Sequence, residues 1–348
     1  MTKTLPPDTD RTASPELPEL EDDSTDGAGG VALDGIVPDD CAGQRLDKVL
    51  AAVFPQHSRS RLQQWCEAGL VTVAGRVSGV RDKARAGEAL HIDLPVLPEE
   101  AAFAPEPLPL NVVYEDKALA VIDKPAGLVV HPAAGNWSGT LLNGLLARYP
   151  ETASLPRAGI VHRLDKDTSG LLVTARTLEA QTALVRQLQA RMINRQYLAL
   201  VWGRAPQPFS VDAPIGRHPR DRLRMAVVQG GKPARTDFAP LAALDTPWGA
   251  MAALRCKLHS GRTHQIRVHL QHAGLALVAD AVYGGRARPD LPLGRQALHA
   301  ARLGFRHPVN GEALEFIAPI PGDLIAFWVQ CGGDAATLDP RQWPALAS

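Results

Sequence analysis

The feature that most constrains the fold of this chain is a proline-rich stretch at residues 95–109. It holds five prolines and an acidic pair, a composition that favours an extended, semi-rigid spacer over a helix or a strand. The 348 residues are also enough for two domains at about 150 residues per domain. We therefore expect a small domain at residues 31–94, a large domain at residues 110–335, and tails at residues 1–30 and 336–348.

The first 30 residues differ in composition from the rest. They hold two basic and eight acidic residues, a net charge of −6, and because the whole chain is formally neutral the remainder carries +6. Such an acidic segment, rich in Pro, Ser, Asp and Gly, buries too little apolar surface to order itself, so we expect a disordered tail. The mildly basic remainder suits an anionic partner, but by itself this charge is weak evidence.

Hydrophobic residues make up 45% of the chain, enough for a sizeable core, which excludes a wholly disordered protein. No apolar run approaches the roughly 18 residues of a membrane span, and the N-terminus lacks a secretory h-region, so we expect a cytoplasmic protein. The cysteines are far apart and form no Cys-x-x-Cys pair, which favours buried free thiols over disulfides or a zinc site. They are Cys41, Cys66, Cys256 and Cys331.

Apolar spacing in the small domain predicts two helices, around residues 46–53 and 62–66, and strands at residues 70–73 and 90–94. The helices would present cations and hydroxyl groups that suit phosphate oxygens of RNA, and a solvated helix face is the alternative. The candidate RNA-binding residues are Arg45, Lys48, Ser58, Arg59 and Arg61. The order of elements resembles the S4 RNA-binding domain, which implies that these helices dock on structured RNA.

Strand-like apolar runs outnumber helical ones in the large domain, and the alternation of strands and helices typical of a doubly wound sheet is missing. This pattern favours an α+β domain on a largely antiparallel sheet. The predicted strands lie at residues 119–122, 170–175, 197–202 and 252–258, and the predicted helices at residues 178–192 and 263–273.

The densest polar cluster, residues 162–170, runs directly into an apolar strand. A charged loop that packs against a buried strand holds its charged groups in a fixed geometry next to an apolar surface, as in many functional sites. The alternative is a solvated turn with local ion pairs and no function. Residues 167–170 also resemble the Asp-Thr-Gly motif of aspartic proteases. Those enzymes need two such motifs, and the other Asp-Thr here, residues 245–246, is followed by Pro247, so that dyad fails.

Residues 162–165, His-Arg-Leu-Asp, followed by Thr-Ser-Gly at residues 168–170, resemble the central motif of the RluA-type pseudouridine synthases. Three further stretches agree in order. The opening motif of the family is similar to residues 121–132 together with residues 139–141. Its tyrosine strand is similar to residues 195–203, although Arg195 stands where many members have lysine. Its third motif is similar to residues 260–270. With the S4-like domain in front, the chain is most similar to members that modify the large ribosomal subunit.

The resemblance implies an isomerisation in which the glycosidic C–N bond of uridine breaks and C5 of the uracil joins the ribose. Because nothing is oxidised or reduced, we expect no cofactor and no metal. The resemblance makes Asp165 the nucleophile, which attacks the sugar or the base. It makes Arg262 the cation that pairs with this carboxylate, and Tyr197 the ring that stacks on the base and is a candidate for proton transfer. Arg163 would enter the space left by the flipped nucleotide.

Other polar residues have plainer interpretations. We expect His162 to be structural, Ile266 and Leu270 to pack beneath the site, and the glycine pairs 230–231 and 284–285 to form turns. The four histidines of the third-motif region lack the spacing of a zinc site, and the arginine-rich loop at residues 217–224 is either an RNA contact or a solvated turn.

We therefore expect a monomeric isomerase that acts on structured RNA, with large-subunit (23S) ribosomal RNA as its substrate, free or in a pre-ribosomal particle. One alternative is a non-catalytic RNA-binding assembly factor that keeps the fold. Such a factor would be expected to lose Asp165, Tyr197 or Arg262, and all three are present. A second alternative is a hydrolase with Asp165 and Asp167 as a carboxylate pair, which no second acidic motif supports.

Overall fold

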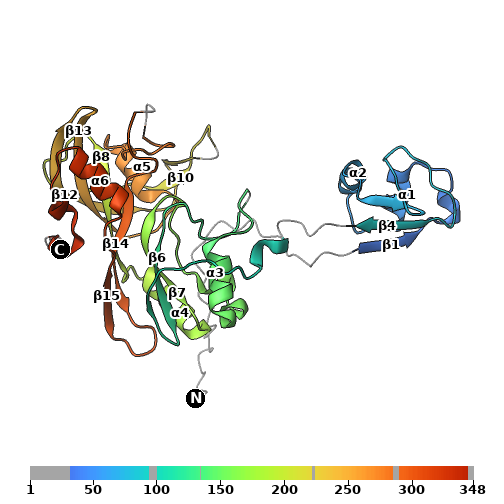
Figure 1. Ribbon diagram of the computed structural model, residues 1–348, viewed down its shortest axis with the longest axis horizontal. Coiled ribbons are helices and arrows are strands. Elements are labelled where there is room, and N and C mark those ends of the chain that lie inside the picture. The colour runs from blue at the N-terminus through green and yellow to red at the C-terminus, as the bar shows by residue number, and fades with distance from the viewer. Residues whose placement is uncertain (1–31, 94–99, 134, 222–223, 285–289, 344–348) are drawn as a thin grey trace, which may run out of the picture. The chain divides into compact units, whose positions relative to one another are not determined.

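The computed structural model divides into two compact units, the smaller ending at Ala104 and the larger beginning at Pro105 (Figure 1). The acidic leader at residues 1–30 and part of the proline-rich stretch lie outside the described residues. The structure describes residues 32–93, 100–133, 135–221, 224–284 and 290–343.

The smaller unit packs two helices on a four-stranded antiparallel sheet. Helices α1 (Leu46–Val53) and α2 (Arg59–Glu67) lie where the apolar spacing predicted them. Their buried leucines share one core with Val71 and Ile92 of the sheet. The strand order is β1-β4-β2-β3, with β1 at Ala32–Ile36, β4 at Ala89–Asp93, β2 at Val71–Val73 and β3 at Arg76–Val77.

The larger unit is built on a nine-stranded sheet in the order β5-β6-β7-β14-β8-β13-β12-β9, with β15 also paired to β14. All paired strands run antiparallel apart from β7 and β14, which are parallel, so the expected α+β architecture is confirmed. The bounds are β5 Val112–Glu115, β6 Leu119–Lys124, β7 Ser169–Ala175, β8 Asn194–Trp202, β9 Phe209–Asp212, β12 Arg235–Thr246, β13 Gly249–Leu258, β14 Leu298–Arg306 and β15 Ala313–Ile317.

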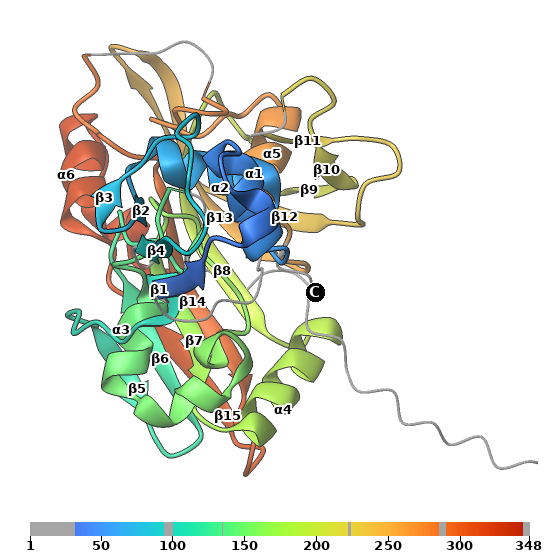
Figure 2. The ribbon, with the colours of Figure 1, turned by 90° about the vertical axis from the view of Figure 1, so that its right-hand side faces the viewer.

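Helices cover both faces of this sheet. Along β8, Tyr197 and Ala199 share a core with α3 (Leu141–Arg148) and α5 (Gln265–His272). The intervening Leu198 faces the opposite side, in a core with α6 (Gly322–Gln330). Helix α4 (Leu178–Gln189) packs with Leu119 and Val121 of β6 in a further core. A separate hairpin, β10 (Ile215–Arg217) and β11 (Met225–Val227), lies beside α5 (Figure 2).

Two expected boundaries are wrong. The second half of the proline-rich stretch is not a spacer, because the amide of Glu106 donates to the Asn143 carbonyl and Leu108 packs over Gly144 of α3. The expected tail from residue 336 onward is also part of the fold. Its first residues form the 3-10 helices Ala335–Leu338 and Pro340–Gln342, and Leu338 and Trp343 are buried against α6. These isolated apolar residues lacked a periodicity that would have identified them.

The four cysteines are buried and free, as expected. Within the described ranges, no helix is long and apolar enough to cross a lipid bilayer.

Candidate active site

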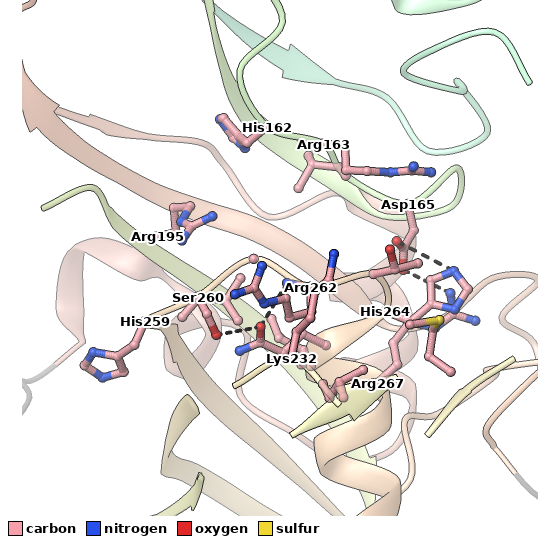
Figure 3. A pocket seen from close by; sticks show the side chains of 18 of the residues that line it. His162, Arg163, Asp165, Arg195, Lys232, His259, Ser260, Arg262, His264 and Arg267 are labelled. Atoms are coloured by element: carbon pink, nitrogen blue, oxygen red, sulfur yellow. Dashed lines mark hydrogen bonds and ion pairs between the residues drawn. The ribbon is translucent and has the colours of Figure 1, made fainter. Parts of the chain in front are cut away.

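A cavity of about 580 Å³ lies where the loop before β7, strand β8 and the segment leading into α5 meet (Figure 3). Asp165 is the one acidic side chain among the described residues that line it. The basic lining side chains are Arg163, Arg191, Arg195, Arg217, Lys232, Arg262 and Arg267. Seven cations around a single carboxylate make the cavity a site for an anionic ligand, because low-dielectric walls strengthen the field of the fixed charges.

The loop that carries Asp165 is fixed from below by Lys124, the last residue of β6. The Lys124 ammonium is fully buried and donates to the carbonyl oxygens of Lys166 (2.9 Å), Pro125 (2.9 Å) and Leu128 (2.8 Å). Burial lowers its pKa to about 8, while the nearby carboxylates of Asp165 and Asp167 raise it. One side chain thus joins the segment after β6 to the loop before β7.

The far side of the loop is held by strand β14 and the residues before it. The amide of Thr168 donates to the Asp165 carbonyl (3.1 Å), closing a turn, and Gln296 Nε2 donates to Thr168 Oγ1 (2.9 Å). Gly170 follows with a φ of +111°, and a Cβ there would lie 2.2 Å from the Ala300 carbonyl oxygen of the parallel neighbour. A glycine is therefore required where β7 enters the sheet.

The carboxylate of Asp165 is paired with Arg267, in the first turn of α5. Arg267 Nη1 donates to Asp165 Oδ2 (2.9 Å), and the other two nitrogens of the guanidinium bind Asp280 at 2.8 and 3.0 Å. Burial alone lowers the pKa of Arg267, but its hydrogen bonds and ion pairs with Asp280 and Asp165 raise it above its ordinary value. A permanently charged, rigidly held guanidinium therefore faces one oxygen of Asp165.

The expectation that Arg262 pairs with Asp165 is wrong. Arg262 lines the cavity, but its Nε donates to the Pro233 carbonyl (3.3 Å) and its backbone amide to Gln265 Oε1 (3.0 Å). It belongs to the loop before α5, whereas the start of the helix itself carries the guanidinium that reaches Asp165.

His264 faces the other oxygen of Asp165. Its Nε2 lies 3.9 Å from Asp165 Oδ1, and its Nδ1 is hydrogen-bonded to the Tyr283 hydroxyl (2.9 Å). Because that hydroxyl already accepts a bond from the Met225 amide (2.8 Å), its own proton can go to Nδ1, which leaves the imidazole proton on Nε2, toward Asp165. Burial lowers the pKa of His264, which favours the neutral ring. Its left-handed φ of +54° is strained for a non-glycine residue, as is common at functional sites.

Tyr197 lies on β8 at the floor of the cavity, and burial raises its pKa to about 12. A neutral phenol ring on the floor suits stacking against a base. Arg163 is exposed at the cavity wall, and no described carboxylate pairs with it. The preceding His162 is buried, and its Nε2 accepts the Val173 amide (3.1 Å), in agreement with the structural role expected of it. Ile266 and Leu270 are buried in the core beneath, also as expected.

The candidate RNA-binding residues of the smaller unit divide into two kinds. Arg45 and Arg59 both pair with the buried carboxylate of Asp47, at 3.2 and 2.6 Å, while about half of each side chain stays exposed. The hydrogen bond from Arg59 is the main reason that the pKa of Asp47 falls to about 2. The two arginines are thus fixed in place with charge still facing solvent.

Ser58, Lys48 and Arg61 differ from that pair. The Ser58 hydroxyl accepts the Arg61 amide as the N-cap of α2, so its hydroxyl serves the helix itself. Lys48 is exposed on α1. The Arg61 guanidinium lies over the Trp65 ring at 5.4 Å. Lys48 and Arg61 are the cations of this group without a carboxylate partner among the described residues.

The remaining histidines of the third-motif region are dispersed. His259 bonds Asp237 (2.5 Å), and His269 bonds Thr236 (2.9 Å) and the Ala213 carbonyl (3.0 Å). Over the ranges that the structure covers, no three potential metal ligands gather. In the arginine-rich loop, Arg217 lines the cavity, and Arg222 lies outside the described residues. The glycines at 230 and 231 form a turn as expected, while Gly285 lies outside the described residues.

Residues 118–272 match the family model described as RNA pseudouridylate synthase, and residues 44–89 match the S4 domain. Two curated bacterial proteins are each 49% identical to the chain, over 318 and 321 residues. Each alignment covers 88% of this chain, and they cover 94% and 85% of the respective relatives. The chain therefore belongs to the RNA pseudouridylate synthase family, whose members are isomerases, and carries an S4 domain.

Both relatives bear the name ribosomal large subunit pseudouridine synthase D, one from Xanthomonas campestris pv. campestris and one from Neisseria meningitidis serogroup B. The protein of that name from Nitrosomonas europaea is 50% identical over 297 residues, 83% of this chain and 85% of the relative. Among solved structures, human RNA pseudouridylate synthase domain containing 1 superposes with a TM-score of 0.52 at 27% identity, covering 67% of this chain and 90% of that one. The expected family and fold class are confirmed.

Sequence reasoning missed the part of the site that surrounds Asp165. Arg267 was within the third motif but had no assigned role, and Asp280 and Tyr283 were not noticed. A signal for Arg267 was present, since it stands between Ile266 and Val268 in an apolar helix, and a buried guanidinium needs a counterion.

Proposed function

We propose that this protein converts uridines of large-subunit ribosomal RNA into pseudouridine, with Asp165 as the nucleophile. The observation that carries the proposal is a lone carboxylate, fixed by Arg267, in a cavity whose other charged side chains, among the described residues, are all arginine or lysine. The cations attract the RNA backbone, and the pairing with Arg267 holds the carboxylate in a fixed orientation for attack. The names of the bacterial relatives support the ribosomal substrate.

In the proposed reaction, Asp165 forms a bond to the sugar or to the base of the target nucleotide, and the N1–C1′ bond breaks. The uracil turns, C5 bonds to C1′, the bond to Asp165 breaks, the C5 proton leaves and N1 gains a proton. The product has the same atoms as the substrate. Tyr197 stacks on the base during this sequence and is the candidate for the proton transfer at C5, because it lines the cavity with Asp165 and carries a hydroxyl group.

The other cations bind the RNA in this proposal. Arg163, exposed beside the nucleophile, fills the gap left by the flipped nucleotide, and Arg262 contacts a phosphate at the cavity wall rather than Asp165. In the S4 domain, Arg45, Lys48, Arg59 and Arg61 hold the backbone of the folded RNA, with Ser58 at the start of α2. We place the protein in the cytoplasm, as a monomer acting on ribosomal RNA or on a pre-ribosomal particle.

The test is carbodiimide-based mapping of pseudouridine in large-subunit ribosomal RNA incubated with the wild-type protein or with Asp165→Asn. We expect stops at specific uridines with wild type and none with the variant, whose fold and RNA affinity should persist because the amide nearly matches the carboxylate in shape. Binding by both proteins without new stops would favour the RNA-binding assembly factor. Equal stops with both proteins would refute the assignment of Asp165.

A further inference from the structure

Strand β8 places a second functional side chain on the floor of the cavity beside Tyr197. Arg195 and Tyr197 are two residues apart on a strand, so their side chains leave the same face of the sheet. Both line the cavity with Asp165 and are nearly enclosed, with 6% and 5% of their surfaces exposed. A base stacked on Tyr197 therefore has Arg195 as a neighbour in the cavity lining.

The Arg195 guanidinium has no partner within the described part of the chain. Its Nε is buried without a hydrogen-bond acceptor, and no described carboxylate lies within ion-pair distance. Burial lowers its pKa, in keeping with a cation that has lost its hydration without gaining a counterion. An unpaired buried charge destabilises a fold. Its presence beside a cavity therefore indicates that a bound ligand supplies the missing hydrogen-bond acceptor.

The backbone opposite has been left open for this guanidinium. Gly261 faces it across the cavity wall, and a Cβ at this position would lie 2.8 Å from Arg195 Nη1. Glycine therefore leaves room for the end of the Arg195 side chain against the loop before α5, in the lining of the cavity. Figure 3 shows Arg195 across the cavity from Asp165.

We propose that Arg195 donates hydrogen bonds to the O4 carbonyl oxygen of the flipped uracil and so selects uridine over cytidine. The inference rests on the proposed function and adds the residue that recognises the base. Arginine offers donors alone, and uracil presents two carbonyl acceptors, O2 and O4. Cytosine has an amino group in place of O4, and a buried donor facing that amino group leaves both groups unpaired.

A backbone phosphate is the other source of an acceptor oxygen. The position of Arg195 argues against it, because the exposed Arg163 and the partly exposed Arg262 lie nearer to solvent, where the RNA backbone must remain. A phosphate contact would also be blind to the identity of the base, so the two sources predict different results.

The test measures the affinity of inactive protein for a ribosomal RNA hairpin that carries a uridine mapped with the wild-type enzyme. The hairpin is made with U or with C at that position, and each protein carries Asp165→Asn. We expect the Asp165→Asn protein to bind the U hairpin about tenfold more tightly than the C hairpin. Adding Arg195→Gln should reduce this ratio to about one, because the amide oxygen of glutamine can accept from cytosine. Adding Arg195→Lys, which keeps a donor-only side chain, should preserve the preference.

Arg191→Gln is the matched control, since Arg191 also lines the cavity but is exposed in the turn after α4. It should weaken binding of both hairpins equally. The inference is overturned if Arg195→Gln weakens the affinity for both hairpins by the same factor, because that result indicates a phosphate contact. It is also overturned if the Asp165→Asn protein binds the U and C hairpins equally well, or if Arg195→Gln leaves the ratio of the two affinities unchanged. A wild-type enzyme that forms no pseudouridine would instead refute the proposed function.

A second measurement separates recognition from a structural role. If Arg195 is kept for the ligand, Arg195→Met should leave the melting temperature of the free protein unchanged or raise it, because an apolar side chain replaces an unpaired buried charge. A structural arginine would give a clear decrease, and that result would contradict the inference.

Discussion

The buried ion pair behind the nucleophile should be essential to stability as well as to catalysis. Arg267→Met keeps an unbranched apolar stem but leaves Asp280, whose carboxylate is fully enclosed, without its counterion. Removing one partner of a buried pair costs about 3–5 kcal/mol. At about 2–4 °C per kcal/mol for a unit of this size, we expect the melting temperature to fall by about 10 °C.

Thermal and urea denaturation of the full chain measure this effect. Asp280→Asn should partly rescue the variant, because the amide oxygen can still accept the Val282 and Tyr283 amides that Asp280 Oδ1 accepts at 2.9 Å. We expect the double variant to be more stable than the sum of the single changes by about 1–3 kcal/mol. Arg204→Met is the control, since its pair with Asp245 is exposed and should contribute almost nothing. Additive effects, or a melting temperature for Arg267→Met within about 2 °C of wild type, would refute the reasoning.

Three further outcomes follow from the structure. Burial lowers the pKa of both His162 and His299 to about 3, so below about pH 6.5 these histidines bind protons in the unfolded chain but not in the folded one. The free energy of unfolding should therefore fall by up to about 1.4 kcal/mol per pH unit for each histidine as the pH decreases. A urea-denaturation midpoint that does not change between about pH 6.5 and 5 would contradict this. Lys124→Met removes the hydrogen-bond donor from three carbonyl oxygens. We expect the free energy of unfolding, measured by urea denaturation, to fall by about 3 kcal/mol or more, and single-turnover pseudouridine formation to be slower. Wild-type values for both would rule out the role of Lys124 in fixing the Asp165 loop. The double variant Lys48→Gln, Arg61→Gln should have a smaller slope of log RNA affinity against log salt concentration, by about one for each phosphate that is no longer neutralised. Lys117→Gln is the control, because Lys117 is exposed and lies outside the S4 domain, and it should leave the slope unchanged.

The sequence was sufficient for the features that local patterns determine. Apolar periodicity identified α1, α2, α4 and α5 and the central strands, and the motif around Asp165 identified the family. The partner of Asp165 required the fold, because Arg262 and Arg267 are five residues apart in one motif, and the register of the loop before β7 against the start of α5 decides which of them reaches the carboxylate. The packing of Leu338 and Trp343 could not be predicted from the sequence either, because single apolar residues in a polar segment show no hydrophobic periodicity.

The unpaired state of Arg195 illustrates the same limit. Its position in an apolar strand predicts burial, but whether a carboxylate lies opposite depends on β13, β14 and the loop before α5, which come together only in the folded sheet.

Release of tritium from ribosomal RNA labelled at C5 of uridine tests the central claim most directly, because C5 loses its hydrogen when it bonds to the ribose. We expect the wild-type protein to release tritium into water from large-subunit RNA in a single turnover, and Asp165→Asn to bind the same RNA and release none. Release by Asp165→Asn at the wild-type rate, or no release by the wild-type protein, would contradict the account.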